Sequence, residues 1–109
     1  MGMNINKDVA NAFWSGEEFN RCNTQVYKRG GLASVVDLHN STIAYRDNEG
    51  APRVSFAGYP THTTAGRLNA ILQRIGHSAQ YARGGMISGV EVDPRAWYIC
   101  EEGKPPVKV

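Results

Sequence analysis

The order of hydrophobic and polar residues predicts a first helix near the start of the chain. Val9 and Phe13 recur at the i, i+4 spacing of one helix face, which indicates the side that packs on a core. Asn6 suits the position that caps a helix start, and Gly16 suits the left-handed position after the last turn. We therefore expect a helix over residues 5–16.

A second helix is predicted further along, ending at Gly76. Its apolar residues fall at i, i+3, i+4 and i+7, at positions Leu68, Ile71, Leu72 and Ile75. Thr63 or Thr64 is expected to cap its first turn. Arg67 and Arg74 lie seven residues apart and are expected to flank one edge of the apolar stripe.

Between the two helices, alternation with a period of two predicts three antiparallel strands, at residues 32–38, 41–46 and 53–57. The alternation assigns six apolar residues to the face that the helices cover: Val36, Leu38, Ile43, Tyr45, Val54 and Phe56. Arg46 and Arg53 then lie on the opposite, solvated face. Before these strands, residues 17–23 are expected to be irregular and residues 23–27 to form a short edge strand.

After the second helix, a hairpin is predicted around the turn Gly84-Gly85, followed by a strand in which Trp97 and Ile99 point inward. The whole chain is thus expected to be a single α+β domain over residues 1–103, with an antiparallel sheet covered on one face by two helices, in the order α-β-β-β-α-β-β. The proline-containing residues 104–109 are expected to form a flexible tail.

Composition narrows the class of protein. A chain of 109 residues supports one core, and a net charge of +2 does not by itself indicate nucleic-acid binding. The absence of a long apolar run and of a signal peptide predicts a soluble intracellular protein without a membrane partner. Cys22 and Cys100 lack metal-ligand spacing and are expected to be structural thiols, so we expect no metal and no cofactor.

One stretch carries a recognisable motif: Tyr59-Pro60-Thr61-His62-Thr63-Thr64-Ala65-Gly66-Arg67-Leu68-Asn69. Together with Asn23-Thr24, Leu38-His39 and Ile43-Ala44, it resembles a family of small uncharacterised bacteriophage proteins that share (Trp/Tyr)-Pro-Thr-x-Thr-Thr-x-x-Arg-Leu-Asn. The resemblance covers roughly residues 6–76 and implies a phage protein acting in the host cytoplasm. It implies no catalytic activity.

Small phage proteins outside the virion are often inhibitors of host complexes. The expectation is therefore a non-enzymatic accessory protein, monomer or homodimer, that binds and inhibits a host protein or ribonucleoprotein complex, as anti-CRISPR and other antidefence proteins do. The alternative is a small nucleic-acid-binding module for double-stranded RNA or DNA that uses an arginine patch. Eight residues are the candidate binding site: Tyr59, His62, Thr63, Thr64, Arg67, Arg74, Arg46 and Arg53.

Structural roles compete with these functional ones. The threonines at the helix start either cap the helix or, with His62 and Arg67, bind an anion. Asp37 and His39 share a strand face near Ser34 and Ser41, but no nucleophile motif accompanies them, and the expectation is no enzyme.

Overall fold

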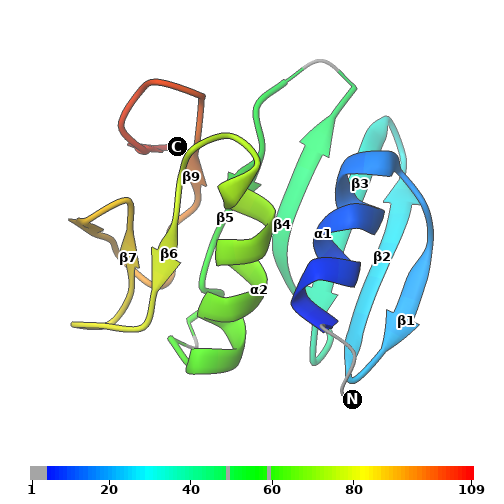
Figure 1. The fold of residues 1–109 in the computed structure, drawn as a ribbon, viewed down its shortest axis with the longest axis horizontal. Coiled ribbons are helices and arrows are strands. Elements are labelled where there is room, and N and C mark those ends of the chain that lie inside the picture. Colours follow the sequence, from blue (N-terminus) through cyan, green and yellow to red (C-terminus); the bar gives the residue numbers. More distant parts are fainter. Residues whose placement is uncertain (1–4, 49, 59) are drawn as a thin grey trace.

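The computed structural model describes residues 5–48, 50–58 and 60–109 and has an α+β fold (Figure 1). Its two helices are α1 (Ile5–Ser15) and α2 (His62–Gln73). Five strands precede α2: β1 (Phe19–Arg21), β2 (Thr24–Arg29), β3 (Leu32–Leu38), β4 (Ser41–Asp47) and β5 (Arg53–Val54). Five short strands follow it: β6 (Ala79–Gln80), β7 (Met86–Ile87), β8 (Val90–Glu91), β9 (Tyr98–Ile99) and β10 (Val107–Lys108).

The strands form two antiparallel sheets. The larger has seven strands in the order β1-β2-β3-β4-β5-β9-β10, and the smaller has the order β6-β7-β8. Both helices lie on one face of the larger sheet, with α1 over β2 and β3, and with α2 beside β4 and β6 (Figure 1). The predicted α+β class and helical layer are confirmed, but the element order contains more strands than expected.

The core lies between the helices and the larger sheet. Val9 and Phe13 of α1 are fully buried, as the helical spacing predicts, and so are Leu68, Ile71 and Leu72 of α2. Burying each such side chain contributes about 1.5–3 kcal/mol relative to exposure. This apolar contact explains why a helix of eleven residues and one of twelve are stable here.

The helix ends agree with the sequence at their C-termini and differ at their N-termini. Gly16 and Gly76 have φ values of 77° and 78°, the left-handed conformation that follows a helix. The cap of α2 is Thr61, whose hydroxyl oxygen accepts from the Thr64 amide at 3.1 Å, and not Thr63 or Thr64. Asn6 does not act as the predicted cap, because it lies inside the first turn of α1.

Two predictions about the first strands are wrong. Residues 19–21, expected to be irregular, pair with β2 as an edge strand, with Phe19 opposite Val26. As a result β2 is an interior strand between β1 and β3, not an edge. The signal in the sequence is faint because β1 carries one apolar residue, Phe19, whose half-buried side chain packs against the core.

The smaller sheet packs beside α2. Its strands β6 and β7 flank the predicted Gly84-Gly85 turn, and the buried side chain of Ile87 joins it to the core. His77, which is 7% exposed, ties this region to the C-terminal segment. Its two ring nitrogens lie 2.6 Å from the Ser88 hydroxyl and 2.7 Å from the Glu101 carbonyl oxygen.

The end of the chain differs from the sequence-based expectation. Val107 and Lys108 pair with β9 as the strand β10, where a flexible tail over 104–109 is predicted. Tyr98 and Cys100 face the core in place of Trp97 and Ile99. The cause is the register of β9, which sets Tyr98 opposite the fully buried Val54.

Candidate functional site

One face of the seven-stranded sheet is covered by no helix of the described residues, and a row of directly paired residues crosses it. The row comprises Tyr27, Val35, Tyr45, Arg53, Ile99 and Val107, one each from β2, β3, β4, β5, β9 and β10. Residues directly opposite each other in an antiparallel sheet share a face. We call this surface the open face. The neighbouring row of Val26, Val36, Ala44, Val54 and Tyr98 faces the helices and is buried.

A β-bulge in β4 decides which side chains reach the open face. Asp37 pairs with Thr42 and Val36 pairs with Ala44, so β4 contains one extra residue, Ile43, at this point. The alternation therefore shifts by one residue after Ile43. Tyr45 turns to the open face and Arg46 turns toward the helices, so the predicted orientations of these two residues are wrong.

Tyr27 anchors one end of the row. Its hydroxyl donates to the Asp37 carboxylate at 2.9 Å, and the Thr42 hydroxyl donates to the other oxygen of that carboxylate at 2.7 Å. Burial raises the pKa of the Tyr27 phenol, the Asp37 carboxylate raises it further, and the nearby Arg29 guanidinium opposes both. Tyr27 therefore remains a neutral aromatic ring at physiological pH.

Tyr45 and Trp97 form the middle of the open face. Their ring centroids lie 5.0 Å apart in an edge-to-face arrangement, and the Arg53 guanidinium lies 5.7 Å from the Tyr45 centroid. Both rings are half-buried, so part of each remains exposed to solvent. Next to Trp97 is a pocket of about 490 Å³, lined by Thr42, Ser55, Ala57, Gly58, Arg95 and Trp97.

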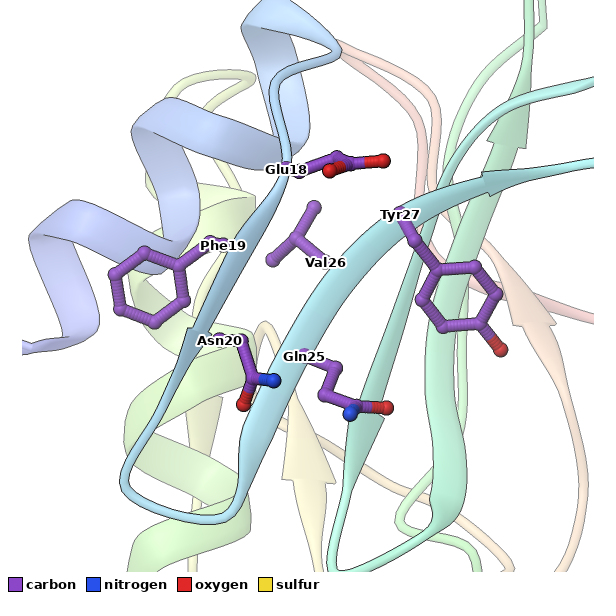
Figure 2. A pocket seen from close by; sticks show the side chains of 6 residues that line it. All are labelled: Glu18, Phe19, Asn20, Gln25, Val26 and Tyr27. Atoms are coloured by element: carbon purple, nitrogen blue, oxygen red, sulfur yellow. The ribbon is translucent and has the colours of Figure 1, made fainter.

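Two further pockets reach the strands at the other end of the open face. Figure 2 shows the first, of about 450 Å³, between β1 and β2, lined by Glu18, Phe19, Asn20, Gln25, Val26 and Tyr27. The second, lined by Asn20, Asn23, Gln25, Asp37, His39 and Asn40, lies beside it. Gln25 is opposite Asp37 and is exposed, so it extends the open face beyond Tyr27.

Arg67 is not a surface residue. Its side chain is 6% exposed and lies between α1, α2 and β2, where Nε donates to the Thr24 hydroxyl at 3.0 Å and Nη1 donates to Asn6 Oδ1. Burial lowers the pKa of its guanidinium. This buried cation joins three elements through neutral oxygens and is therefore not available to a phosphate.

Arg46 is also held by the protein itself. Nη2 donates to the carbonyl oxygens of Phe13 and Trp14 at 3.0 and 2.8 Å, and Nε donates to Phe13 at 3.3 Å. These carbonyls belong to the last turn of α1 and have no partner within the helix. The Ser34 hydroxyl also donates to Phe13 at 2.6 Å. Arg46 thus stabilises the negative end of α1.

Arg74 lies on the helical side of the molecule. Its Nη2 donates to Asn11 Oδ1 at 3.3 Å, and its guanidinium lies 5.8 Å from the Trp14 ring centroid. Arg46 lies 5.4 Å from the same ring. The four predicted arginines therefore do not form one patch, because only Arg53 lies on the open face.

The predicted site at the start of α2 is divided. Thr61, Thr63 and Thr64 line a pocket of about 480 Å³ together with His39. His62 turns elsewhere, with its ring 4.5 Å from that of Tyr81. Thr61 caps the helix, and its hydroxyl lies 3.0 Å from the hydroxyl of the buried Thr64, so contacts within the protein account for both. Tyr59 lies outside the described residues.

No group of three or more His, Cys, Asp or Glu residues in the described part of the chain is arranged to hold a metal ion. No helix within residues 5–48, 50–58 and 60–109 is long and apolar enough to cross a membrane. Asp37 and Ser34 lie on opposite faces of β3, whereas Asp37 and His39 line the same pocket.

The grouping on the open face cannot be predicted from the local sequence. Alternation places Tyr45 and Trp97 inside the core, and no local pattern singles out Tyr27 or Arg29. The pairing of β5 with β9, which brings Trp97 beside Tyr45, joins segments that lie more than forty residues apart. No local pattern reports such a pairing.

Comparison with known proteins places the chain among viral proteins. The pattern of the Kyanoviridae Gp96 protein family matches residues 3–88, which is well over half of the chain. The chain therefore belongs to this family, and it is a phage protein, as the motif around Pro60 and Arg67 predicts. No curated protein and no solved structure matches the chain.

Proposed function

We propose that this phage protein is a non-enzymatic accessory protein that binds a host macromolecular complex through the open face and inhibits it, in the manner of anti-CRISPR and other antidefence proteins. The partner is a host protein or ribonucleoprotein complex in the host cytoplasm. The phage protein binds it as a monomer or a homodimer. One observation carries the proposal: the row from Tyr27 to Val107 crosses six strands with no helix over it.

The residue types on the open face favour macromolecular binding. Tyrosine, tryptophan and arginine are enriched among the residues that dominate binding energy at protein interfaces. The ring of Tyr45, at the middle of the row, contacts both the Trp97 ring and the Arg53 guanidinium. The pockets on this face lie beside the row at the protein surface. Such a surface suits a large partner better than a small molecule, which binds in an enclosed cavity.

The alternative, a module for double-stranded RNA or DNA with an arginine patch, has less support. A duplex-binding patch needs several cations on one surface. Arg46 and Arg67 donate to oxygens of the protein itself, and Arg53 and Arg74 lie on different sides of the molecule.

An affinity pull-down from host lysate, with and without nuclease, tests the proposal with two matched variants. Tyr45→Ser changes the open face, whereas Tyr81→Ser changes an exposed tyrosine that directly follows β6, contacts His62 and is not part of the row. We expect one discrete host complex to be captured by the unaltered protein and by Tyr81→Ser, and to be lost with Tyr45→Ser. The activity of that complex should fall as the unaltered protein is added in stoichiometric amounts.

Two results would contradict the proposal. The first is capture that survives Tyr45→Ser, because the binding surface would then lie elsewhere. The second is a captured complex whose activity does not change when the protein is in excess, which would leave binding without inhibition. Circular dichroism of both variants verifies that each remains folded.

A further inference from the structure

We propose that the open face binds a single-stranded nucleic acid, with bases stacked on its aromatic rings and phosphates beside its arginines. The aromatic residues are Tyr27, Tyr45 and Trp97, and the arginines are Arg29, Arg53 and Arg95. This inference rests on the proposed function, since both place the binding surface on the open face. It adds the chemistry of what is bound there.

The aromatic rings form a platform of suitable spacing. Tyr27 and Tyr45 lie on either side of Val35 in the same cross-strand row, so they are two strand spacings apart, or about 10 Å. Val35, between them, is only 2% exposed. Trp97 continues the platform from Tyr45 toward β9. Exposed aromatic rings on a sheet offer stacking sites to unpaired bases of any sequence.

Each ring has an arginine beside it. The Arg53 guanidinium lies 5.7 Å from the Tyr45 centroid. Arg95 and Trp97 line the same pocket, and Arg29 lies near the Tyr27 hydroxyl. An alternation of rings and cations matches an alternation of bases and phosphates, which is the arrangement that proteins use for single strands.

Asp37, the carboxylate beside Tyr27 on the platform, is hydrogen-bonded within the protein. Both carboxylate oxygens of Asp37 accept hydrogen bonds, one from the Tyr27 hydroxyl and the other from the Thr42 hydroxyl. Glu18 lines the pocket beside Tyr27, and Asp93 accepts a hydrogen bond from the Arg95 amide, so the arginines do not outnumber the carboxylates around the platform. What favours an anionic partner is the position of each arginine beside a ring. A duplex would present its phosphates but keep its bases stacked within the helix, so the rings favour a single strand.

Fluorescence anisotropy with purified protein tests this directly. The probe is a labelled oligo(dT) of about twelve nucleotides, compared with an oligo(U) of the same length and with a duplex DNA. The double variant Arg53→Glu with Arg95→Glu alters the platform. The double variant Arg74→Glu with Arg83→Glu makes the same change in net charge on exposed residues elsewhere.

We expect the single strands to bind more tightly than the duplex. The platform variant should weaken binding about tenfold or more, whereas the matched variant should change it about twofold or less. Three phosphate contacts predict a slope of about −2 for log K against log salt, at about −0.7 for each contact. Tyr45→Leu should weaken binding without changing that slope.

Three results would overturn the inference: no binding of either single strand at about 50 mM salt, equal loss in the two charge variants, or a preference for the duplex. Its failure is distinguishable from failure of the proposed function. If a host protein is captured after nuclease and lost with Tyr45→Ser while the oligonucleotides do not bind, the partner is a protein and only this inference fails. If Tyr45→Ser leaves every capture unchanged, the proposed function itself fails.

Discussion

The rings of Tyr45 and Trp97 meet edge to face on the open face, with their centroids 5.0 Å apart, although β4 and β9 are separated in the sheet by β5. Tyr45 reaches this position because the bulge at Ile43 reverses the alternation of β4. Trp97 reaches it because β9 sets Tyr98 toward the core. The contact between the two rings therefore depends on both the bulge in β4 and the order of the strands in the sheet.

A double-mutant cycle measures this contact. Tyr45→Leu and Trp97→Leu each remove one ring, and their effects on the free energy of unfolding should be non-additive by about 0.5–1.5 kcal/mol, as for other aromatic pairs. Urea denaturation of the four proteins gives the coupling. Additive effects would mean that the two rings do not meet in solution.

The buried Arg67 predicts an unusual dependence between two substitutions. Thr24→Val removes the oxygen that accepts from Arg67 Nε and leaves a buried cationic donor without its partner, so it should cost about 2–3 kcal/mol of stability. In the background Arg67→Met no donor remains, and the same Thr24→Val change should cost less than about 1 kcal/mol. Equal costs in the two backgrounds, measured by denaturation in urea, would place Arg67 in solvent.

Two adjacent glycines give a matched test of the β6–β7 turn. A Cβ atom at Gly85, where φ is 116°, would lie 2.9 Å from the fully buried Phe56 ring, whereas a Cβ at Gly84, where φ is 83°, would meet nothing within 4 Å. Gly84→Ala should cost about 1–2 kcal/mol through backbone strain. Gly85→Ala adds overpacking of about 1–3 kcal/mol. Thermal denaturation that ranks Gly84→Ala as the more harmful change would contradict this arrangement.

The two cysteines should differ in reactivity. Burial raises the pKa of the Cys100 thiol to about 11, whereas Cys22 is exposed. At about pH 8 a thiol reagent should modify one cysteine quickly in the folded protein and both in denaturant. The Cys100 thiol ionises more readily in the unfolded chain, so its contribution to stability is present below pH 9 and should be lost as the pH rises toward 11. A Cys100→Ala variant should lack that pH dependence of stability. For the reactivity, rapid modification of Cys100 in the folded protein at pH 8 would contradict its burial.

Local sequence signals predicted the helices well because each carries its own marks. The spacing of Leu68, Ile71 and Leu72 and the position of Gly76 define α2 without knowledge of the rest of the chain. The cap was misplaced to Thr63 or Thr64 because several threonines near the helix start have the same hydroxyl, and only the φ and ψ of Thr61 identify the one that caps.

The candidate site was less predictable. Period-two alternation assumes an unbroken strand, and the bulge at Ile43 violates it, which reverses Tyr45 and Arg46. Arg67 was expected at the surface because arginine is seldom buried, yet Thr24 and Asn6 supply oxygens from distant elements that satisfy it inside. Such compensation depends on tertiary contacts and leaves no mark in the local pattern.

Photo-crosslinking in host cells tests the central claim, that the open face is the binding surface, most directly. A photoreactive amino acid replaces Gln25, which is exposed on β2 of the open face, or Gln73, which is exposed at the end of α2 on the opposite side. We predict a discrete crosslinked product from position 25 and none from position 73. A product from position 73 with none from position 25 would contradict the account, because the partner would then contact the helices and not the sheet.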